Sequence, residues 1–512
     1  MLSPPTILIF TVVITSCVWT LLRRSHKNLP PGPTAEPLIG HVRMMPQELI
    51  GETFYEWSKT YGDVMLLKVF NRTIIVLNST KAAHELLEKR SQYYSCRPPF
   101  PVADTMGLGR QLGFLPYGKQ FLKIRKAFQQ YFSRQESFVF MPIQLEESRL
   151  LVKNLIEEPI ERLAPNLYRF TTTVITSAVY GHRITAEDDR FLKIGSALEN
   201  VIIHAGAVGS TPVDLFPWLK HMPSWFPGTY HHIYALKSRP RIQVVYDYPY
   251  EFVLDEMSQG IAPHSFLASQ LQDLDPKSPE YEQDIEDIKT SGATAFLAGV
   301  DTSLSSLMTF LLCMVLNPEK QHKAQEEIDR VIGTERLPEY TDRGSLPYIE
   351  NVLQEVLRWY PALHFAIPHR ATQDDIYRGM FIPKGAVIFP NARGMSLDEN
   401  VYKNPTEFRP ERFLPKAQGG HEEPYFNAGW GYGRRVCPGR FLADVSLWLA
   451  MATILAALEL SKVKDENGIE IDFVPKHKVV FAQQFAPFPM EIKPRSDKAT
   501  QLIRQATLGL GM

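Results

Sequence analysis

Four cysteines occur in the chain, and one of them, Cys437, has the surroundings of a metal-binding thiolate. It lies in the segment WGYGRRVCPGR (residues 430–440), directly before an apolar run with helical spacing. A sulfur just before a helix receives backbone N–H groups and the positive end of the helix dipole, which favours the thiolate. Arg434 and Arg435 add positive charge, and no neighbouring cysteine or histidine could complete a zinc site. Such a thiolate can be the single protein ligand of a haem iron.

A long apolar segment carries a second pair of reactive residues. Residues 285–316 contain no proline and Asn317-Pro318 follows, so the segment predicts a helix of about 48 Å, far longer than average. Its middle reads AGVDT, in which the Thr302 hydroxyl can bond to the carbonyl group four residues earlier and open a groove. Asp301 and Thr302 are then placed to pass protons. A solvated helix face is the alternative, and the apolar residues on both sides disfavour it.

Two further segments have charges at the spacing of an ion-pair network. Glu355 and Arg358 stand three residues apart on one face of a predicted helix, and Arg412 lies in the segment PERF. Taken alone, Glu355 and Arg358 are equally a surface ion pair that contributes little to stability.

The elements that must position these residues are mostly helical, because strand-like runs are short and few. Helices are predicted over residues 81–89, 125–132, 281–316, 318–332, 349–359 and 439–460, and strands over residues 63–70, 73–77, 386–389 and 478–482. The pattern favours one large, mainly α-helical domain with small β-sheets.

Together, these segments resemble those of the cytochrome P450 family, the haem-thiolate monooxygenases. The resemblance runs from an N-terminal apolar segment and the sequence LPPGP (residues 29–33) to the cysteine segment, and it implies the family's fold. It implies that Cys437 ligates the iron of haem b, and that Asp301 and Thr302 deliver protons to dioxygen. Glu355, Arg358 and Arg412 would form a network that braces the cysteine loop. Residues 367–389 and 408–414 resemble fungal members of secondary metabolism.

The resemblance also implies cationic partners for the two haem propionates. Arg125 matches the arginine of the family's WxxxR motif, although Phe121 replaces the tryptophan. His369 and Arg435 match two other positions that contact propionates. Trp430 stands near the sulfur where the family usually has phenylalanine.

Composition excludes several other classes of protein. The formal net charge is −1, which gives no basic field for nucleic acid, and without a CxxC pair a disulfide framework or zinc ribbon is not expected. The chain has no Walker or GxGxxG loop, so electrons must come from another protein; the resemblance implies NADPH–cytochrome P450 reductase. Basic residues 119, 123, 125 and 126 could form its docking face or a merely solvated face.

The N-terminus predicts a membrane anchor. Residues 1–22 carry no charge and Arg23, Arg24 and Lys27 follow, which places the rest of the chain on the cytoplasmic side, as expected at the endoplasmic reticulum. A cleaved signal peptide is the alternative, but the charges stand after the apolar run. The predicted divisions are a transmembrane anchor (1–22), a basic, proline-rich linker (23–47), the haem domain (48–494) and a loose tail (495–512).

The expected activity is insertion of one oxygen atom from O2 into an apolar small molecule such as a terpenoid. The pocket wall is expected from residues 100–115, 201–216, 295, 299, 363–367 and 483–485, which are largely apolar. One alternative is a haem-thiolate enzyme that rearranges or dehydrates its substrate without a reductase, against which the Asp301–Thr302 pair argues. Another is a haem-binding sensor or carrier without turnover.

Overall fold

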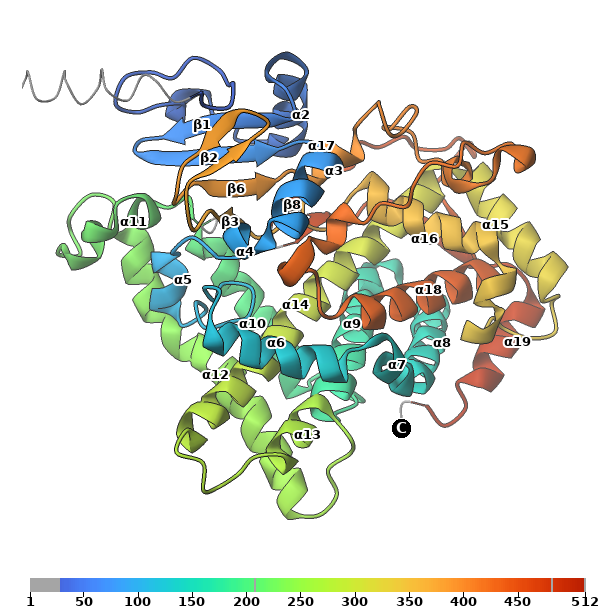
Figure 1. Ribbon diagram of the computed structural model, residues 1–512. Helices are drawn as coiled ribbons and strands as arrows, with labels where there is room; N and C mark the ends of the chain where they lie inside the picture. The colour runs from blue at the N-terminus through green and yellow to red at the C-terminus, as the bar shows by residue number, and fades with distance from the viewer. Residues whose placement is uncertain (1–27, 207–208, 480–481, 511–512) are drawn as a thin grey trace, which may run out of the picture.

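A single long helix, α14 (Tyr281–Leu316), runs through the middle of the protein, and other helices pack around it (Figure 1). The computed structural model describes residues 28–206, 209–479 and 482–510. The second half of α14, residues 307–315, is buried throughout and forms the main core with the apolar faces of α8, α9, α16 and α18. The helix is this long because no proline interrupts it before Pro318.

The other α-helices range from single turns to the long helix α12. Their bounds are α2 (Ile50–Tyr61), α3 (Thr80–Ala83), α4 (Ser91–Tyr94), α5 (Pro101–Met106), α6 (Lys119–Tyr131), α7 (Arg134–Ser137), α8 (Met141–Glu157), α9 (Leu163–Tyr180), α10 (Arg190–Ala205), α11 (Pro212–Leu215), α12 (Tyr230–Ser258), α13 (Phe266–Gln272), α15 (Pro318–Val331), α16 (Pro347–Trp359), α17 (Ala392–Ser396), α18 (Arg440–Ala457) and α19 (Asp497–Ala506).

The strands form one four-stranded sheet and three two-stranded ones. The larger sheet has the order β1 (Val64–Val69), β2 (Arg72–Leu77), β6 (Val387–Pro390) and β3 (His369–Arg370). β1 and β2 form an antiparallel hairpin, whereas β6 pairs parallel to β2 with Ile75 opposite Ile388. In Figure 1 the orange β6 therefore lies beside the blue N-terminal strands. The small sheets pair β4 (Asp375–Tyr377) with β5 (Met380–Ile382), β7 (Leu458–Ser461) with β10 (Glu491–Pro494), and β8 (His477–Val479) with β9 (Gln483–Phe485).

Most predicted elements are confirmed, and the differences have local causes. The helix predicted over 281–316 has those bounds, but the one predicted over 439–460 ends at Ala457 because residues 458–461 pair with β10. The strand predicted over 478–482 is instead part of the β8–β9 pair, with residues 480–481 outside the described range. Helix α12 was not predicted, because Pro240 and Pro249 lie inside it.

The prediction of a loose tail from residue 495 is wrong for the last helix. The Ser496 hydroxyl caps α19 by accepting a hydrogen bond from the N–H of Ala499 at 3.1 Å. Ile503 is fully buried, and α19 packs against α8. The segment is polar but strongly amphipathic, so one apolar face is enough to dock it.

Two described helices, α14 and α18, are long and apolar enough to cross a membrane, but 72% of the relevant window of each is buried inside the protein. They are core helices of the folded protein. The predicted anchor, residues 1–22, lies outside the described residues.

Candidate active site

Cys437 lies between the short helix η11 (Gly433–Arg435) and the N-terminus of α18. Its backbone N–H donates to the carbonyl oxygen of Trp430 at 2.8 Å, which closes the loop around the sulfur. Burial raises the pKa of the Cys437 thiol; the backbone N–H groups of Gly439 and Arg440 and the charges of Arg125 and Arg440 oppose that rise. The predicted helix-terminal environment is present, although a bound metal cation would have to complete the deprotonation.

The positive charge near the sulfur comes from other residues than the two predicted. Arg434 turns away to the hydroxyl of Tyr117, at 2.6 Å, and Arg435 donates to three backbone carbonyl groups at 2.7–3.0 Å. Arg125 instead donates to the carbonyl group preceding the cysteine at 2.7 Å, and Arg440 to the carbonyl group of the cysteine itself at 2.9 Å. Residues that are adjacent in a tight loop point in different directions. The sequence therefore predicted the wrong arginines as the source of positive charge near the sulfur.

The groove predicted in α14 is present. The Thr302 hydroxyl donates to the carbonyl oxygen of Ala298 at 2.8 Å, and both residues line the same cavity as Cys437. Gly299 lies between these two residues in α14, and a Cβ atom there would overlap the side chain of Ile175 on α9. The glycine therefore allows α9 and α14 to pack closely beside the cavity.

Asp301 lines the same cavity, and its carboxyl group is a weaker acid than usual. Burial raises the pKa of Asp301 to about 6, with a further rise from the negative charge of Glu199, while Lys478 acts in the opposite direction. Within the described part of the chain, its carboxyl group makes no hydrogen bond. A carboxyl group with a pKa near neutrality can both hold and release a proton.

Three arginines in the cavity wall lack a carboxylate partner among the described residues. Arg97 and Arg125 are buried and Arg435 is partly buried, and all three donate hydrogen bonds to backbone carbonyl groups. Burial lowers the pKa of Arg435 to about 10 and lowers those of the other two, and Arg97 and Arg435 repel each other. The Nε atom of Arg125 has no hydrogen-bond partner at all. Buried cations of this kind are stabilised by carboxylates, and the two propionates of a haem would fit this cluster.

Arg97 was not predicted. It reaches the cavity from the loop after α4, where its Nε donates to the carbonyl oxygen of Gly113 at 2.8 Å. The only sequence signal is an arginine followed by two prolines, which does not separate a cavity residue from a surface one.

His369 lies in β3 at the same wall, but its proton is on the wrong side for a propionate. Its Nδ1 lies 2.7 Å from the carbonyl oxygen of Tyr94, so Nδ1 must carry the proton in the neutral ring. Burial lowers the pKa of His369, and the charges of Arg97 and Arg435 lower it further. Among these residues, Arg97 is therefore the better donor to an anionic group.

Two departures from the family pattern have structural counterparts. The guanidinium carbon of Arg435 lies 3.7 Å from the ring centroid of Phe121, so this residue contributes a cation–π contact in place of an indole N–H. Trp430 ends the short helix η10 (Ala428–Trp430) and lines the cavity beside the sulfur.

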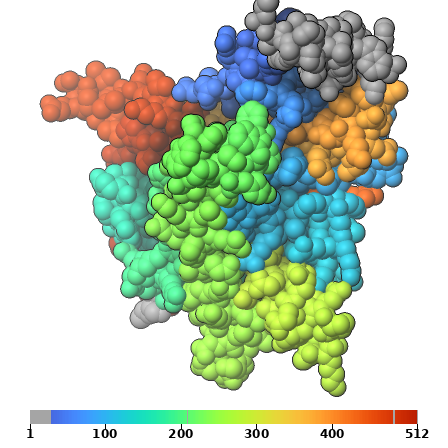
Figure 2. Space-filling view, turned by 90° about the vertical axis from the view of Figure 1, so that its left-hand side faces the viewer, coloured from blue at the N-terminus to red at the C-terminus, as the bar shows by residue number. Residues whose placement is uncertain are grey.

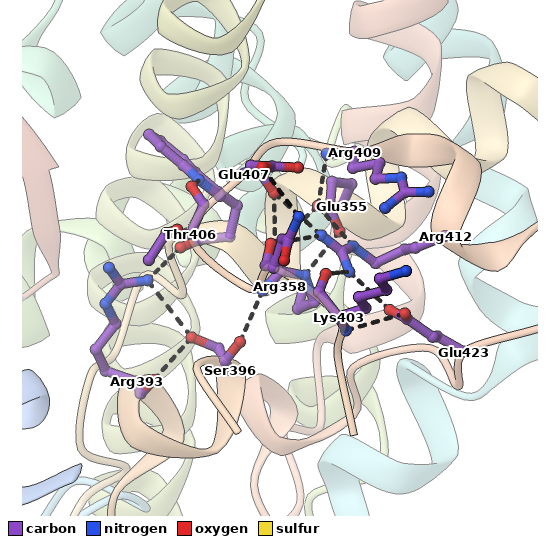
Figure 3. A network of polar contacts seen from close by, with 12 residues as sticks. Glu355, Arg358, Arg393, Ser396, Lys403, Thr406, Glu407, Arg409, Arg412 and Glu423 are labelled. Atoms are coloured by element: carbon purple, nitrogen blue, oxygen red, sulfur yellow. Dashed lines mark hydrogen bonds and ion pairs between the residues drawn. The ribbon is translucent and has the colours of Figure 1, made fainter. Parts of the chain in front are cut away.

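Glu355, Arg358 and Arg412 are all fully buried and form one network (Figure 3). Arg358 donates to both carboxylate oxygens of Glu355 at 2.7 and 2.8 Å, and Arg412 donates to Oε1 at 2.9 Å. Arg412 also reaches Glu423 at 2.7 Å, and Arg358 reaches the carbonyl group of Ser396 at 2.7 Å. The surface-pair alternative is therefore excluded, and the network ties α16 to the segment that leads to the cysteine loop.

The basic residues of α6 do not form a free cationic face. Lys119 pairs with Glu280 at 2.9 Å, and Lys123 pairs with Asp284 and with Asp287. Arg125 is buried. Lys126 is exposed, and among the described residues no carboxylate contacts it. The predicted docking face is largely neutralised by α14.

The cavity has a volume of about 320 Å³ and a mostly apolar lining. Predicted wall residues that do line it are Leu108, Gln111, Leu112, Gly113, Phe114, Ile202, Ala295, Gly299, Leu363, Ala366 and Ile367. The predicted contribution of residues 483–485 is wrong, because β9 packs behind α14, where the hydroxyl of Ser305 donates to the carbonyl group of Gln483. Sequence reasoning missed the wall residues of α9 and α10, namely Tyr168, Ile175, Val179, Gly195, Leu198 and Glu199.

Comparison with known proteins agrees with this geometry. The sequence model of the family described as "Cytochrome P450" matches residues 30–484. Cytochrome P450 monooxygenase 136 of Postia placenta is 35% identical over 492 residues, covering 95% of this chain and 93% of the relative. Cytochrome P450 monooxygenase ple1 of Rhodocybe pseudopiperita is 36% identical over 496 residues, with coverage of 95% and 93%. Cytochrome P450 monooxygenase claR of Ampulloclitocybe clavipes is 36% identical over 514 residues, with coverage of 98% and 94%.

Members of this family are oxidoreductases that bind haem through a cysteine thiolate and use dioxygen, a redox partner and a small-molecule substrate. The family model matches most of this chain, and the structure has the cysteine loop and the buried network that braces it. The chain belongs to the cytochrome P450 family and is a haem-thiolate monooxygenase.

Proposed function

We propose that the protein is a membrane-anchored monooxygenase in which Cys437 is the haem ligand and NADPH–cytochrome P450 reductase is the electron donor. The observation that carries the site assignment is the cavity itself: the cysteine, the groove at Thr302 and three arginines without carboxylate partners all face it. Within the described residues, no three histidine, cysteine or acidic side chains converge, which suits a metal held by one protein ligand. When bound, the haem supplies the activation of dioxygen and the oxygen transfer.

Asp301 and Thr302 hold and move protons. The pKa of Asp301, about 6, lets its carboxyl group take up a proton near neutral pH. The Thr302 hydroxyl, fixed by its bond to the Ala298 carbonyl group at 2.8 Å, keeps its oxygen available as an acceptor beside that carboxyl group. Arg97, Arg125 and Arg435 hold the propionates, and Glu355, Arg358 and Arg412 keep the cysteine loop in place.

A lipophilic substrate suits the rest of the cavity, whose wall of leucine, isoleucine, valine and phenylalanine excludes water. A terpenoid or another secondary metabolite has this character. The membrane location is supported by the uncharged residues 1–22 and by aromatic residues of the segment between α10 and α12, in which Trp218 and Trp225 are 53% and 78% exposed. This segment (green) lies across the front of the molecule in Figure 2.

The test of the site is the absorption of the ferrous carbon monoxide complex, whose red-shifted band reports thiolate ligation. Cys437→Ala is expected to abolish the band. Cys96→Ala and Cys313→Ala are the matched controls, since both residues are buried cysteines elsewhere, and both variants should keep it. An unchanged band in the Cys437 variant would refute the assignment.

A further inference from the structure

Tyr168 brings a hydroxyl group from α9 into the mostly apolar wall of the cavity. It projects from α9 toward α10, where a Cβ atom at residue 195 would overlap its hydroxyl oxygen, so Gly195 makes the room that the phenol needs. A glycine in a helix interior lowers helix stability by about 1 kcal/mol relative to alanine. Here the missing Cβ atom leaves room for the phenol. The side chain of Thr172 donates toward the phenol oxygen, and no described residue accepts a hydrogen bond from the phenol O–H itself.

Glu199 stands one helical turn after Gly195 on the same face of α10 and also lines the cavity. Its Oε1 accepts from the Nζ of Lys478 at 2.6 Å, and the side chain is 27% exposed. Among the described residues, Oε2 receives no hydrogen bond. Lys478 already balances the charge of this carboxylate, while Oε2 has no hydrogen-bond partner among the described residues.

The carboxylate of Glu199 lies near enough to the phenol of Tyr168 to affect its ionisation. Burial raises the pKa of Tyr168, and the negative charges of Asp301 and Glu199 raise it further. The phenol therefore stays protonated and can donate, whereas the carboxylate can only accept. Their wall neighbours on α10, Leu198 and Ile202, are apolar, and Asp301 on α14 is the other charged group that acts on the phenol.

We propose that Tyr168 and Glu199 form a recognition site for a hydroxyl group, so that the substrate is a lipophilic alcohol. An alcohol donates its O–H to Oε2 of Glu199 and accepts from the phenol of Tyr168. A ketone can use only the phenol, and a hydrocarbon leaves both groups unpaired. The balancing charge of Lys478 disfavours an ammonium group. The inference rests on the proposed function, since it assigns the substrate class of the same cavity.

A reaction that places a hydroxyl group on a hydrocarbon skeleton must then supply the substrate. The protein would oxidise a molecule that already carries oxygen, and Tyr168 and Glu199 would fix which end of that molecule lies toward α10.

The test is binding to the ferric holoenzyme, followed by the shift of the Soret band that accompanies displacement of water from the iron. The probes are 2-adamantanol, 2-adamantanone and adamantane, which share one rigid skeleton. The wild type should bind the alcohol about tenfold or more tightly than the other two, since a hydrogen bond to a charged group contributes roughly 10- to 100-fold in affinity. Tyr168→Phe should weaken alcohol binding about fivefold, and Glu199→Met about 10- to 100-fold.

Adamantane binding is the internal control. Its affinity should stay within about twofold in both variants, because neither substitution removes a large apolar contact with the hydrocarbon. Lys478→Met removes the ion pair but keeps the acceptor, so the preference for the alcohol should persist. The proposal is overturned if the wild type shows no preference, if the variants weaken all three probes equally, or if the alcohol gives the opposite shift by ligating the iron. Loss of the ferrous carbon monoxide band would instead be a failure of the proposed function.

Discussion

Arg412 is the residue whose replacement tests how the cysteine loop is held. It is fully buried and makes five hydrogen bonds: one to Glu355 at 2.9 Å, one to Glu423 at 2.7 Å, and three to backbone carbonyl groups at 2.9, 3.1 and 3.3 Å. Arg412→Met keeps much of the volume and removes all five. Arg358 still satisfies Glu355, but the second carboxylate, on Glu423, is left buried without its cation.

Breaking a buried ion pair by removing one partner costs about 3–5 kcal/mol. Domains are typically stable by about 5–15 kcal/mol, so this is a large share of the total. We expect a lower urea midpoint with an unchanged slope, measured by far-ultraviolet circular dichroism, because stability changes while the surface exposed on unfolding does not. Haem loss should also accelerate, since the network holds the segment before the cysteine loop.

The matched control is Arg336→Met. Arg336 makes a two-bond ion pair with Asp342 at 2.6 and 2.7 Å, but its side chain is 50% exposed. An exposed pair of this kind contributes about 0–1 kcal/mol. If both variants shift the urea midpoint equally, burial is not the source of the network's strength, and the reasoning is wrong.

Three further outcomes are expected. Thr302→Ala should keep haem and substrate binding but lower the ratio of product formed to NADPH oxidised, with peroxide in place of product, because a positioned group that takes part in proton transfer contributes about 10²–10⁴-fold. An unchanged ratio would reject the relay. Because the pKa of Asp301 in the folded protein, about 6, lies above the ordinary value of 3.8, the folded protein binds this proton more tightly, and stability is lost as pH rises from about 4 to 6. Asp301→Asn should therefore make the urea midpoint less dependent on pH across this range. A pH dependence equal to that of the wild type would contradict the raised pKa of Asp301. Deleting residues 1–22 should release much of the protein from membranes with its haem intact, and haem loss on deletion would show that the segment belongs to the core.

Sequence patterns were sufficient where the relevant neighbours are close along the chain. The helix over residues 281–316 follows from an unbroken apolar run that ends at Asn317-Pro318. The hydrogen bond of Thr302 to Ala298 spans one helical turn, and Cys437 precedes its helix in the same segment. Such features depend on backbone geometry within a few residues, which the residue types specify.

Features that depend on contacts between distant segments could not be predicted from the pattern. The strand over 458–461 has helical periodicity but pairs with β10, and α19 is polar yet docks through Ile503. The lysines at 119 and 123 are basic in sequence, but α14 supplies their carboxylates. In each case the partner lies far away in the chain.

The same holds for the polar groups of the site. Cys437, Thr302 and Glu355 could be named from the sequence because each stands in a local motif, whereas Arg97, Tyr168 and Glu199 stand in none. Their roles arise only where helices and loops from separate parts of the chain enclose one cavity. Burial, and not residue type, then decides which charges are compensated and which groups remain free to bind a ligand.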